Sequence, residues 1–227
     1  MAALRLAESS WYYAAVLFLF LLSVSILAPP FLIWSGHQDA ASFLYNLHSY
    51  DHQWIYRSQC IFKDASGNLI LDDCIIQGKE SEANISTLYT KNGNAFYNGV
   101  FTQYKQSQIG SNKAEKVERS GMVGYKFAND TRDYAIYIPW MLSMVAYPYL
   151  FGWRAKMPNL IWFISGIMPL AIDGVFQLLG FWESTNLIRM VTGAIAGITV
   201  GIYSSNILID IRSKGQMDGK ETSKRAS

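Results

Sequence analysis

The sequence predicts an α-helical membrane protein with about four transmembrane helices and an α+β extracytoplasmic insert between helices 1 and 2. Hydrophobic residues make up 51% of the 227 residues and charged residues only 16%, whereas about 25% charged is usual in soluble domains. The hydrophobic residues also form long runs, and a polar block, residues 36–133, separates the first run from the others. The chain is therefore divided between lipid and water.

The first apolar run, residues 11–34, contains no charged residue. As a helix it would extend about 36 Å at 1.5 Å per residue, enough to cross a hydrocarbon core of about 30 Å. It is too long and too aromatic for the apolar part of a cleaved signal peptide. We expect Pro29 and Pro30 to end or kink this helix near the outer surface.

Three further runs follow the polar block, and Asp173 and Arg189 are their charged residues. Tyrosines and tryptophans flank the runs, as in the aromatic belts of membrane proteins. The expected spans are residues 134–153, 158–181 and 187–209. The expected domains are an N-terminal transmembrane helix (1–35), an extracytoplasmic domain (36–133), a three-helix transmembrane bundle (134–211) and a cytoplasmic tail (212–227).

The orientation follows from the basic residues of the short connecting segments. Arg5, the pair Arg154 and Lys156, and the basic tail fall on one side if there are four spans. Short segments rich in Lys and Arg stay in the cytoplasm. We therefore expect a multi-pass protein of the cell membrane with both termini cytoplasmic and residues 36–133 outside.

The outside block contains both cysteines of the chain, Cys60 and Cys74. The turn-forming residues between them favour a β-hairpin, with Gly67 at the tip in a positive-φ conformation. A tip at Gly67 would place Cys60 opposite Cys74, so an oxidising compartment favours a disulfide. The alternative is two free thiols.

The rest of the block shows short elements and two glycosylation sequons. Apolar spacing indicates a helix within residues 40–55, while residues 69–71, 96–104 and 122–127 are expected to form strands. Residues 106–121 are polar and charged and are expected to form a flexible loop. Asn84 and Asn129 begin sequons, which are used only if the host glycosylates this compartment.

The C-terminal half carries a dense pattern of polar and glycine residues. It reads Pro169-x3-Asp173-Gly174-x2-Gln177-x2-Gly180, then Glu183-Ser184-x-Asn186-x2-Arg189, then Thr192-Gly193. This pattern resembles DUF2085, an uncharacterised family of predicted prokaryotic multi-pass membrane proteins, and the resemblance implies that the chain is a divergent member. The family usually has Arg where this chain has Trp182. The resemblance implies a membrane architecture and no particular activity.

Two upstream motifs of the family appear in altered form, at residues 51–58 and 129–137. The cysteines that the family carries there are missing from this chain, and they would be its natural metal or redox groups. The resemblance therefore gives no support to a thiolate-based role.

Asp173 and Arg189 form the first candidate site, because charges within a span are costly and are usually paired or functional. Gln177 follows Asp173 by four residues and shares its helical face. One interpretation is a proton, ion or polar-ligand site, and the other is a structural ion pair. Glu183 and the polar residues after it either cap the fourth span or form a small polar site near the outside domain.

His48 and His52 form the second candidate, because four-residue spacing places both imidazoles on one face of a helix. With Asp51 they could bind a divalent metal, and the alternative is ordinary surface or structural histidines. No other cofactor is predicted. All three histidines lie outside the expected spans, which argues against an intramembrane haem.

Gly193, Gly197 and Gly201 recur every four residues and permit close helix packing, within the bundle or against another subunit. The sequence has no P-loop, nucleophile elbow or Rossmann fingerprint, and a net charge of +2 without a basic aromatic patch argues against nucleic acid. The favoured function is an accessory or scaffold subunit of a membrane complex, with lipid and a membrane protein or a second copy as partners. A metal-binding membrane enzyme and a small transporter are the alternatives.

Overall fold

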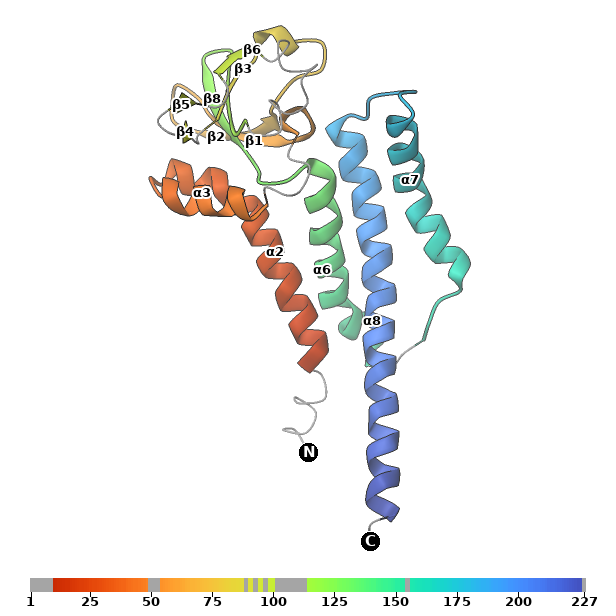
Figure 1. The fold of residues 1–227 in the computed structure, drawn as a ribbon. Coiled ribbons are helices and arrows are strands. Elements are labelled where there is room, and N and C mark those ends of the chain that lie inside the picture. Colours follow the sequence, from red (N-terminus) through yellow and green to blue (C-terminus); the bar gives the residue numbers. More distant parts are fainter. Residues whose placement is uncertain are drawn as a thin grey trace. The chain divides into compact units, whose positions relative to one another are not determined.

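The computed structural model describes residues 10–48, 54–87, 90–91, 94–95, 98–100, 114–153 and 156–225 (Figure 1). The chain divides into two compact units. One contains Met1–Leu22, Ala135–Trp182 and Val191–Ser227, and the other contains Ser23–Tyr134 and Glu183–Met190. We call them the bundle unit and the sheet unit, and each is described by itself.

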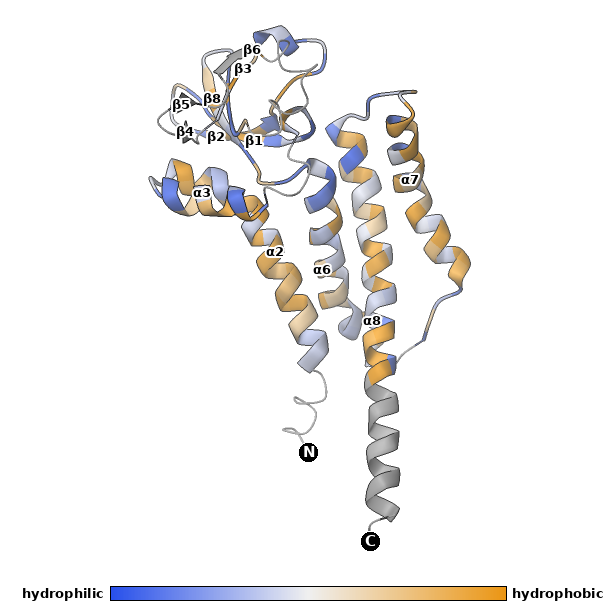
Figure 2. Ribbon diagram, in the orientation of Figure 1, coloured by the Kyte–Doolittle hydropathy of each residue, from blue (hydrophilic) through white to orange (hydrophobic). Residues whose placement is uncertain are grey.

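Three helices in the described part of the chain are long and apolar enough to cross a membrane. They are α2 (Ser10–Trp34), α7 (Leu160–Leu178) and the first part of α8, Asn186–Ile211. Their apolar character is visible as the orange segments of Figure 2. The prediction of a helical membrane protein is therefore supported, with three candidate spans.

Helix α6 (Thr131–Phe151) covers the run in which a further span was predicted, but it is not among these three. Its first turn carries Arg132 and Asp133, and Pro139 and Pro148 lie inside it. A count of four spans is thus not established. Helix α8 runs from Asn186 to Arg225, so helical structure continues into the region expected to be a separate tail.

Helix α2 does not end at its two prolines but continues to Trp34, so only the alternative of a kink stays a prediction. A proline at position 30 has no N–H to donate to the carbonyl of Ile26, four residues earlier. In the sheet unit this carbonyl instead accepts a hydrogen bond from the backbone N–H of Ala128, at 2.9 Å. The backbone group left by the proline is thereby satisfied, which lets the helix continue.

The sheet unit is built around a six-stranded antiparallel sheet with the strand order β2-β1-β8-β7-β3-β6. Its core is formed by small and apolar residues that include both cysteines, Ile55, Phe62, Ile85 and Val117. The strands are β1 (Gln59–Lys63), β2 (Leu69–Asp73), β3 (Asn84–Ser86), β6 (Asn98–Val100), β7 (Lys116–Arg119) and β8 (Met122–Lys126). A separate pair joins β4 (Thr90–Lys91) to β5 (Asn94–Ala95).

The hairpin β1–β2 forms, but its register differs from the predicted one. Cys60 lies opposite Asp72, and the loop is centred on Ser66. The Asp64 carboxylate accepts hydrogen bonds from the Asn68 backbone N–H and the Ser66 hydroxyl, both at 2.8 Å, and closes the turn one residue earlier. Gly67 does adopt a positive φ, of 91°.

The predicted disulfide between Cys60 and Cys74 is present, with 4.9 Å between the two Cα atoms. Cys74 lies just past the end of β2, and its N–H donates to the Ser58 carbonyl at 3.0 Å. The bridge therefore joins β1 to the residue after β2, diagonally rather than directly across the strands. Both cysteines are fully buried.

Other elements match the predictions to different degrees. Strand β8 confirms the strand expected at 122–127, and β6 lies within the one expected at 96–104. Helix α3 (Gln38–Leu47) and a 3-10 turn at Ile55–Arg57 replace the single helix expected at 40–55. The loop expected at 106–121 is wrong for Lys116–Arg119, which form the inner strand β7; residues 101–113 lie outside the described part of the chain.

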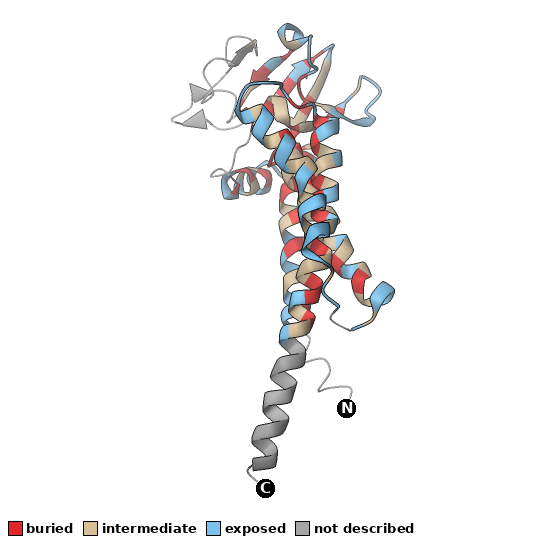
Figure 3. Cartoon of the chain, turned by 90° about the vertical axis from the view of Figure 1, so that its right-hand side faces the viewer, coloured by how far each residue is buried: buried red, intermediate tan, exposed pale blue. Residues whose placement is uncertain are grey.

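The bundle unit packs α6 and α7 against α8. A Cβ added to Gly197 would lie 2.3 Å from the Ile136 carbonyl oxygen, and one added to Gly166 would lie 2.1 Å from the Thr199 hydroxyl. Close approach therefore depends on glycine in both helix pairs. Helix α7 is the most exposed of the candidate spans, with only 6% of its apolar window buried (Figure 3).

Candidate functional site

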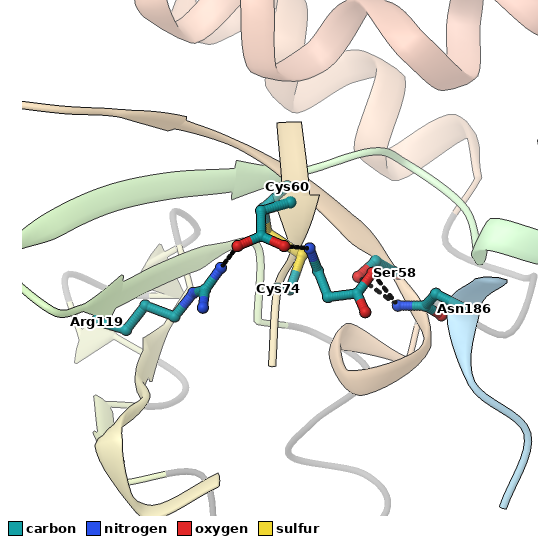
Figure 4. Close-up of polar contacts among 7 residues, drawn as sticks. Ser58, Cys60, Cys74, Arg119 and Asn186 are labelled. Carbon is teal, nitrogen blue, oxygen red and sulfur yellow. Dashed lines mark hydrogen bonds and ion pairs between the residues drawn. A yellow bond between two sulfur atoms is a disulfide. The ribbon is translucent and has the colours of Figure 1, made fainter. Parts of the chain in front are cut away.

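Segments from three of the family-like motifs meet in the sheet unit. Asn186, from the motif that begins α8, donates from its side-chain amide to the Ser58 carbonyl at 3.3 Å and to the Asp73 carboxylate at 3.0 Å (Figure 4). Its amide oxygen accepts from the Arg189 guanidinium at 3.3 Å. The motif at the start of α8 is thus tied to the segment around Ser58 and to the end of β2.

Asp130, from the other upstream motif, closes this arrangement. Its carboxylate accepts a hydrogen bond from the Trp54 backbone N–H at 2.9 Å. Burial is the main cause that raises the pKa of Asp130 well above its usual value, and the charge of Asp133 raises it further. The cations Lys126, Arg57 and Arg189 lower the pKa of Asp130 in part. The carboxylate therefore lies among three cations in a region of low dielectric constant.

Lys126 is the second buried charge of this region and is fully buried. Burial lowers the pKa of Lys126 to about 8, and the carboxylates of Glu115 and Asp130 partly offset that effect. The backbone carbonyl of Lys126 accepts a hydrogen bond from the Tyr45 hydroxyl at 2.5 Å. We call Lys126, Asp130, Arg57, Arg189 and Glu115 the buried charge network.

A cavity of about 230 Å³ lies beside this network in the sheet unit. Its wall combines carboxylates, hydroxyls and amides with two isoleucines and a tyrosine. The lining residues are Tyr56, Asp73, Ile75, Ile76, Gln77, Glu80, Glu183, Ser184, Thr185 and Asn186. The cavity can therefore offer hydrogen-bond acceptors and negative charge beside an apolar wall.

The ring of Tyr56, which forms the aromatic part of the cavity wall, stacks with the guanidinium of Arg57. The Arg57 guanidinium lies 5.0 Å from the ring centre of Tyr56 and 5.2 Å from that of Trp54. Burial raises the pKa of Tyr56, so its phenol remains protonated at neutral pH. The stacking fixes the ring position without using its hydroxyl.

The predicted intramembrane site is divided between the two units. Asp173 lies in α7, is 2% exposed, and accepts a hydrogen bond from the Trp182 indole at 3.4 Å. Gln177 follows it by one turn, and Glu183 lines the cavity. The contacts described above place Arg189 beside Asn186 and Asp130. Pairing of Asp173 with Arg189 stays a prediction.

The predicted metal site is described in part. His48 is 7% exposed, and its Nε2 atom lies 2.9 Å from the Ser25 hydroxyl of α2. Asp51 and His52 lie outside the described residues. Among the residues that are described, no group of three or more histidines, cysteines or carboxylates could hold a metal ion. Metal binding through His48, Asp51 and His52 stays a prediction.

The two sequons differ in exposure. Asn84 is exposed on β3, whereas Asn129 is 2% exposed at the entry to α6. A glycan cannot be accommodated on a buried asparagine without local unfolding, so burial disfavours Asn129. Glycosylation of Asn84 stays a prediction.

The three glycines of α8 are buried, and two of them have described contacts within the chain. Gly197 lies against the α6 backbone at Ile136, and a Cβ on Gly201 would lie 2.7 Å from the Trp140 carbonyl oxygen. These two glycines therefore serve packing inside the bundle unit. Gly193 is buried one turn earlier.

Several residues of the cavity and the network were not predicted. Asp73 and Lys126 belong to no motif, Tyr56 occupies a variable position of the motif at residues 51–58, and all three lie far along the chain from Asn186. A possible signal was the position of Lys126 in a strand, where its alternation with Tyr125 placed a charge on the buried face. No pattern in the sequence points to Asp73, because its role depends on where α8 begins in space.

Comparisons with known proteins find similarity in the C-terminal part of the chain. Residues 114–203 match the family model DUF2085, described as a predicted membrane protein. The chain is also 37% identical over 89 residues to the uncharacterized protein MJ1492 of Methanocaldococcus jannaschii, a match that covers 39% of this chain and 57% of that protein. No solved structure matches the chain. Over residues 114–203, the chain is therefore similar to DUF2085, a family of predicted membrane proteins.

Proposed function

We propose that the protein is an accessory or scaffold subunit of a membrane complex, and that its sheet unit binds the partner outside the membrane. In this proposal α6 is a fourth span, both termini are cytoplasmic, and residues 36–133 form the extracytoplasmic domain. The basic segments of the sequence support this orientation, and the buried disulfide fits an oxidising compartment.

The observation that carries the proposal is the edge strand β2. It is at one end of the strand order and, among the described strands, pairs only with β1. Leu69, Ile70 and Leu71 are 48%, 41% and 53% exposed, so apolar residues on both faces of the strand are open to solvent. An exposed apolar edge strand is a template for pairing with another chain, and proteins that do not use one usually protect it with charge or a bulge.

The partner that fits this edge is a protein segment in extended conformation. Such a segment would add a strand to the sheet through backbone hydrogen bonds, with apolar side chains that cover the three exposed residues. Asp72 and Asp73 limit the apolar stretch at one end. Their carboxylates already contact Arg119 and Asn186, respectively, which keeps that end fixed.

The test is purification of the full chain from native membranes in mild detergent, followed by mass spectrometry of the complex. We expect a stoichiometric membrane-protein partner with the wild type and its loss with Ile70→Lys, because a charge at the edge opposes strand addition. Ser81→Lys is the matched control, since it adds the same charge at another exposed site of the sheet unit.

Two results would contradict the proposal. One is recovery of the wild-type chain without any stoichiometric partner. The other is retention of the partner by Ile70→Lys at the level of Ser81→Lys, which would place the contact elsewhere.

A further inference from the structure

Helix α3 begins immediately after the first candidate span. Helix α2 ends at Trp34 and α3 starts at Gln38. The turn between them is fixed by hydrogen bonds from the Gly36 N–H to the Ile33 carbonyl at 3.0 Å and from the His37 N–H to the Leu32 carbonyl at 2.8 Å. So short a link reaches only about 10 Å even when extended. If α2 spans the membrane, α3 therefore starts at its surface.

One face of α3 is fixed to the rest of the sheet unit. Ala41 and Tyr45 are 0% and 1% exposed and pack in a cluster with Ile33 and Ala128. The Tyr45 hydroxyl donates to the Lys126 carbonyl, and His48 contacts Ser25 of α2. These contacts determine which sides of the helix are left exposed.

A second apolar stripe remains exposed on α3. Phe43 is 65% exposed and Leu47 is 57% exposed. Ala40 is also exposed and lies on the same side of the helix, because it precedes them by three and seven residues. The polar residues Ser42 and Asn46 fall on a different side, and Asp39, four residues before Phe43, lies at the border of the stripe. The helix thus has a buried apolar face, an exposed apolar stripe and an exposed polar face.

We propose that the exposed stripe of α3 lies in the headgroup–acyl boundary of the bilayer, so that α3 is an interfacial helix. Lipid is the occupant because the stripe is continuous along the chain with the candidate span α2, which itself contacts lipid. An amphipathic helix parallel to the membrane plane buries its apolar stripe in that boundary and keeps its polar face in water. In Figure 1, α3 turns sharply away from the axis of α2, as this arrangement requires.

Contact between the exposed stripe of α3 and the lipid would fix the distance of the sheet unit from the membrane. Phe43 and Leu47 enter the lipid boundary, while the opposite face holds Tyr45 against the end of β8. This inference does not depend on a protein partner at β2, because the two surfaces are formed by different elements.

The test uses the full chain in lipid nanodiscs, with one spin label at a time on Phe43→Cys, Leu47→Cys or Asn46→Cys. The native cysteines are fully buried in a disulfide and do not compete for the label. Collision with oxygen, which concentrates in lipid, is compared with collision with a water-soluble nickel chelate. We expect the labels at positions 43 and 47 to favour oxygen at least several-fold over the label at position 46.

A label on Ile70→Cys, on the sheet edge, serves as a further water-exposed reference. Unchanged thermal unfolding of each labelled protein shows that the fold is retained. The proposal is overturned if the labels at positions 43 and 47 meet the nickel chelate as often as that at Asn46→Cys. It is also overturned if both are shielded from oxygen and nickel alike, because protein rather than lipid would then cover the stripe.

Discussion

The sheet unit and the bundle unit bury polar groups in different ways. In the sheet unit, buried charges of both signs surround one another, with Asp130 beside Lys126, Arg57 and Arg189. In the bundle unit, apart from the buried Asp173, the described contacts between helices are made by neutral pairs such as the Tyr147 hydroxyl on the Asn206 amide oxygen at 2.8 Å. An ion needs compensating charge wherever it is buried, whereas a neutral pair can be satisfied by a single hydrogen bond, which suits a lipid environment.

Other contacts between helices of the bundle unit are also neutral hydrogen bonds. The Trp140 indole donates to the Ser204 hydroxyl at 2.9 Å, and the Tyr12 hydroxyl donates to the Met144 carbonyl at 2.5 Å. Each contact joins helices far apart in the sequence through small or amphipathic side chains. The comparison teaches that the two units will respond differently to the loss of a buried polar group.

The largest effect is expected for Lys126→Met, which removes a cation from the buried charge network. We expect a loss of about 3 kcal/mol in the free energy of unfolding, because breaking a buried charge arrangement from one side leaves the other charges uncompensated. Denaturant unfolding of the purified protein in detergent measures it. The double variant Lys126→Met, Asp130→Asn should recover part of the loss, and equal losses in the single and double variants would contradict the network.

The pH dependence of stability gives a second test of the network. Burial lowers the pKa of Lys126 from 10.5 to about 8, so between these values the unfolded chain binds more protons than the folded one. Stability therefore rises with pH in this window, on the order of 1 kcal/mol between about pH 8 and 9. Lys126→Met should lack this rise. A wild-type unfolding temperature that falls over the same window as steeply as that of the variant would argue against a buried, neutralisable lysine.

The smallest effect is expected for Tyr147→Phe in the bundle unit. This substitution removes one neutral hydrogen bond to Asn206, for which about 0.6 kcal/mol is typical between membrane helices. The Asn206 amide oxygen also accepts from the Lys156 backbone N–H at 2.8 Å, so it keeps a partner. Unfolding in detergent, measured beside the lipid-exposed control Ile198→Ala, should show a small loss without pH dependence. A loss as large as that of Lys126→Met would erase the distinction between the units.

The sequence predicted what depends on long apolar runs and local turn chemistry. Residues 11–34 and the runs around Asp173 and Gly197 are recognisable because lipid demands long uncharged stretches. The disulfide could be predicted because Cys60 and Cys74 bracket turn residues, although the register could not, since it depended on how the Asp64 side chain closed the loop. The run at α6 was predicted to be a span but is not among the three candidates, and its tyrosines and prolines suit either a span or a buried helix.

Other features depended on contacts far along the chain. Strand β7 was not recognised because Arg119 occupies a buried position, where it lies 4.4 Å from the Phe62 ring centre and contacts Asp72. A charged residue at this position of the sequence is typical of a loop, and only the contacts with Phe62 and Asp72 explain why Arg119 is buried in a strand. The cavity was likewise unpredictable, because Tyr56, Asp73 and Glu183 come from segments that only the fold brings together.

The prolines of α2 give the first helix a role beyond that of an anchor. Since Pro30 cannot use the Ile26 carbonyl, that oxygen is free to hold the backbone of Ala128, three residues before α6 begins. The link is made by main-chain atoms, the Ala128 N–H and the Ile26 carbonyl. Restoring an N–H at position 30 would introduce a competing donor from within the helix, and the join between α2 and the segment that leads into α6 would then loosen although no contact residue had been altered.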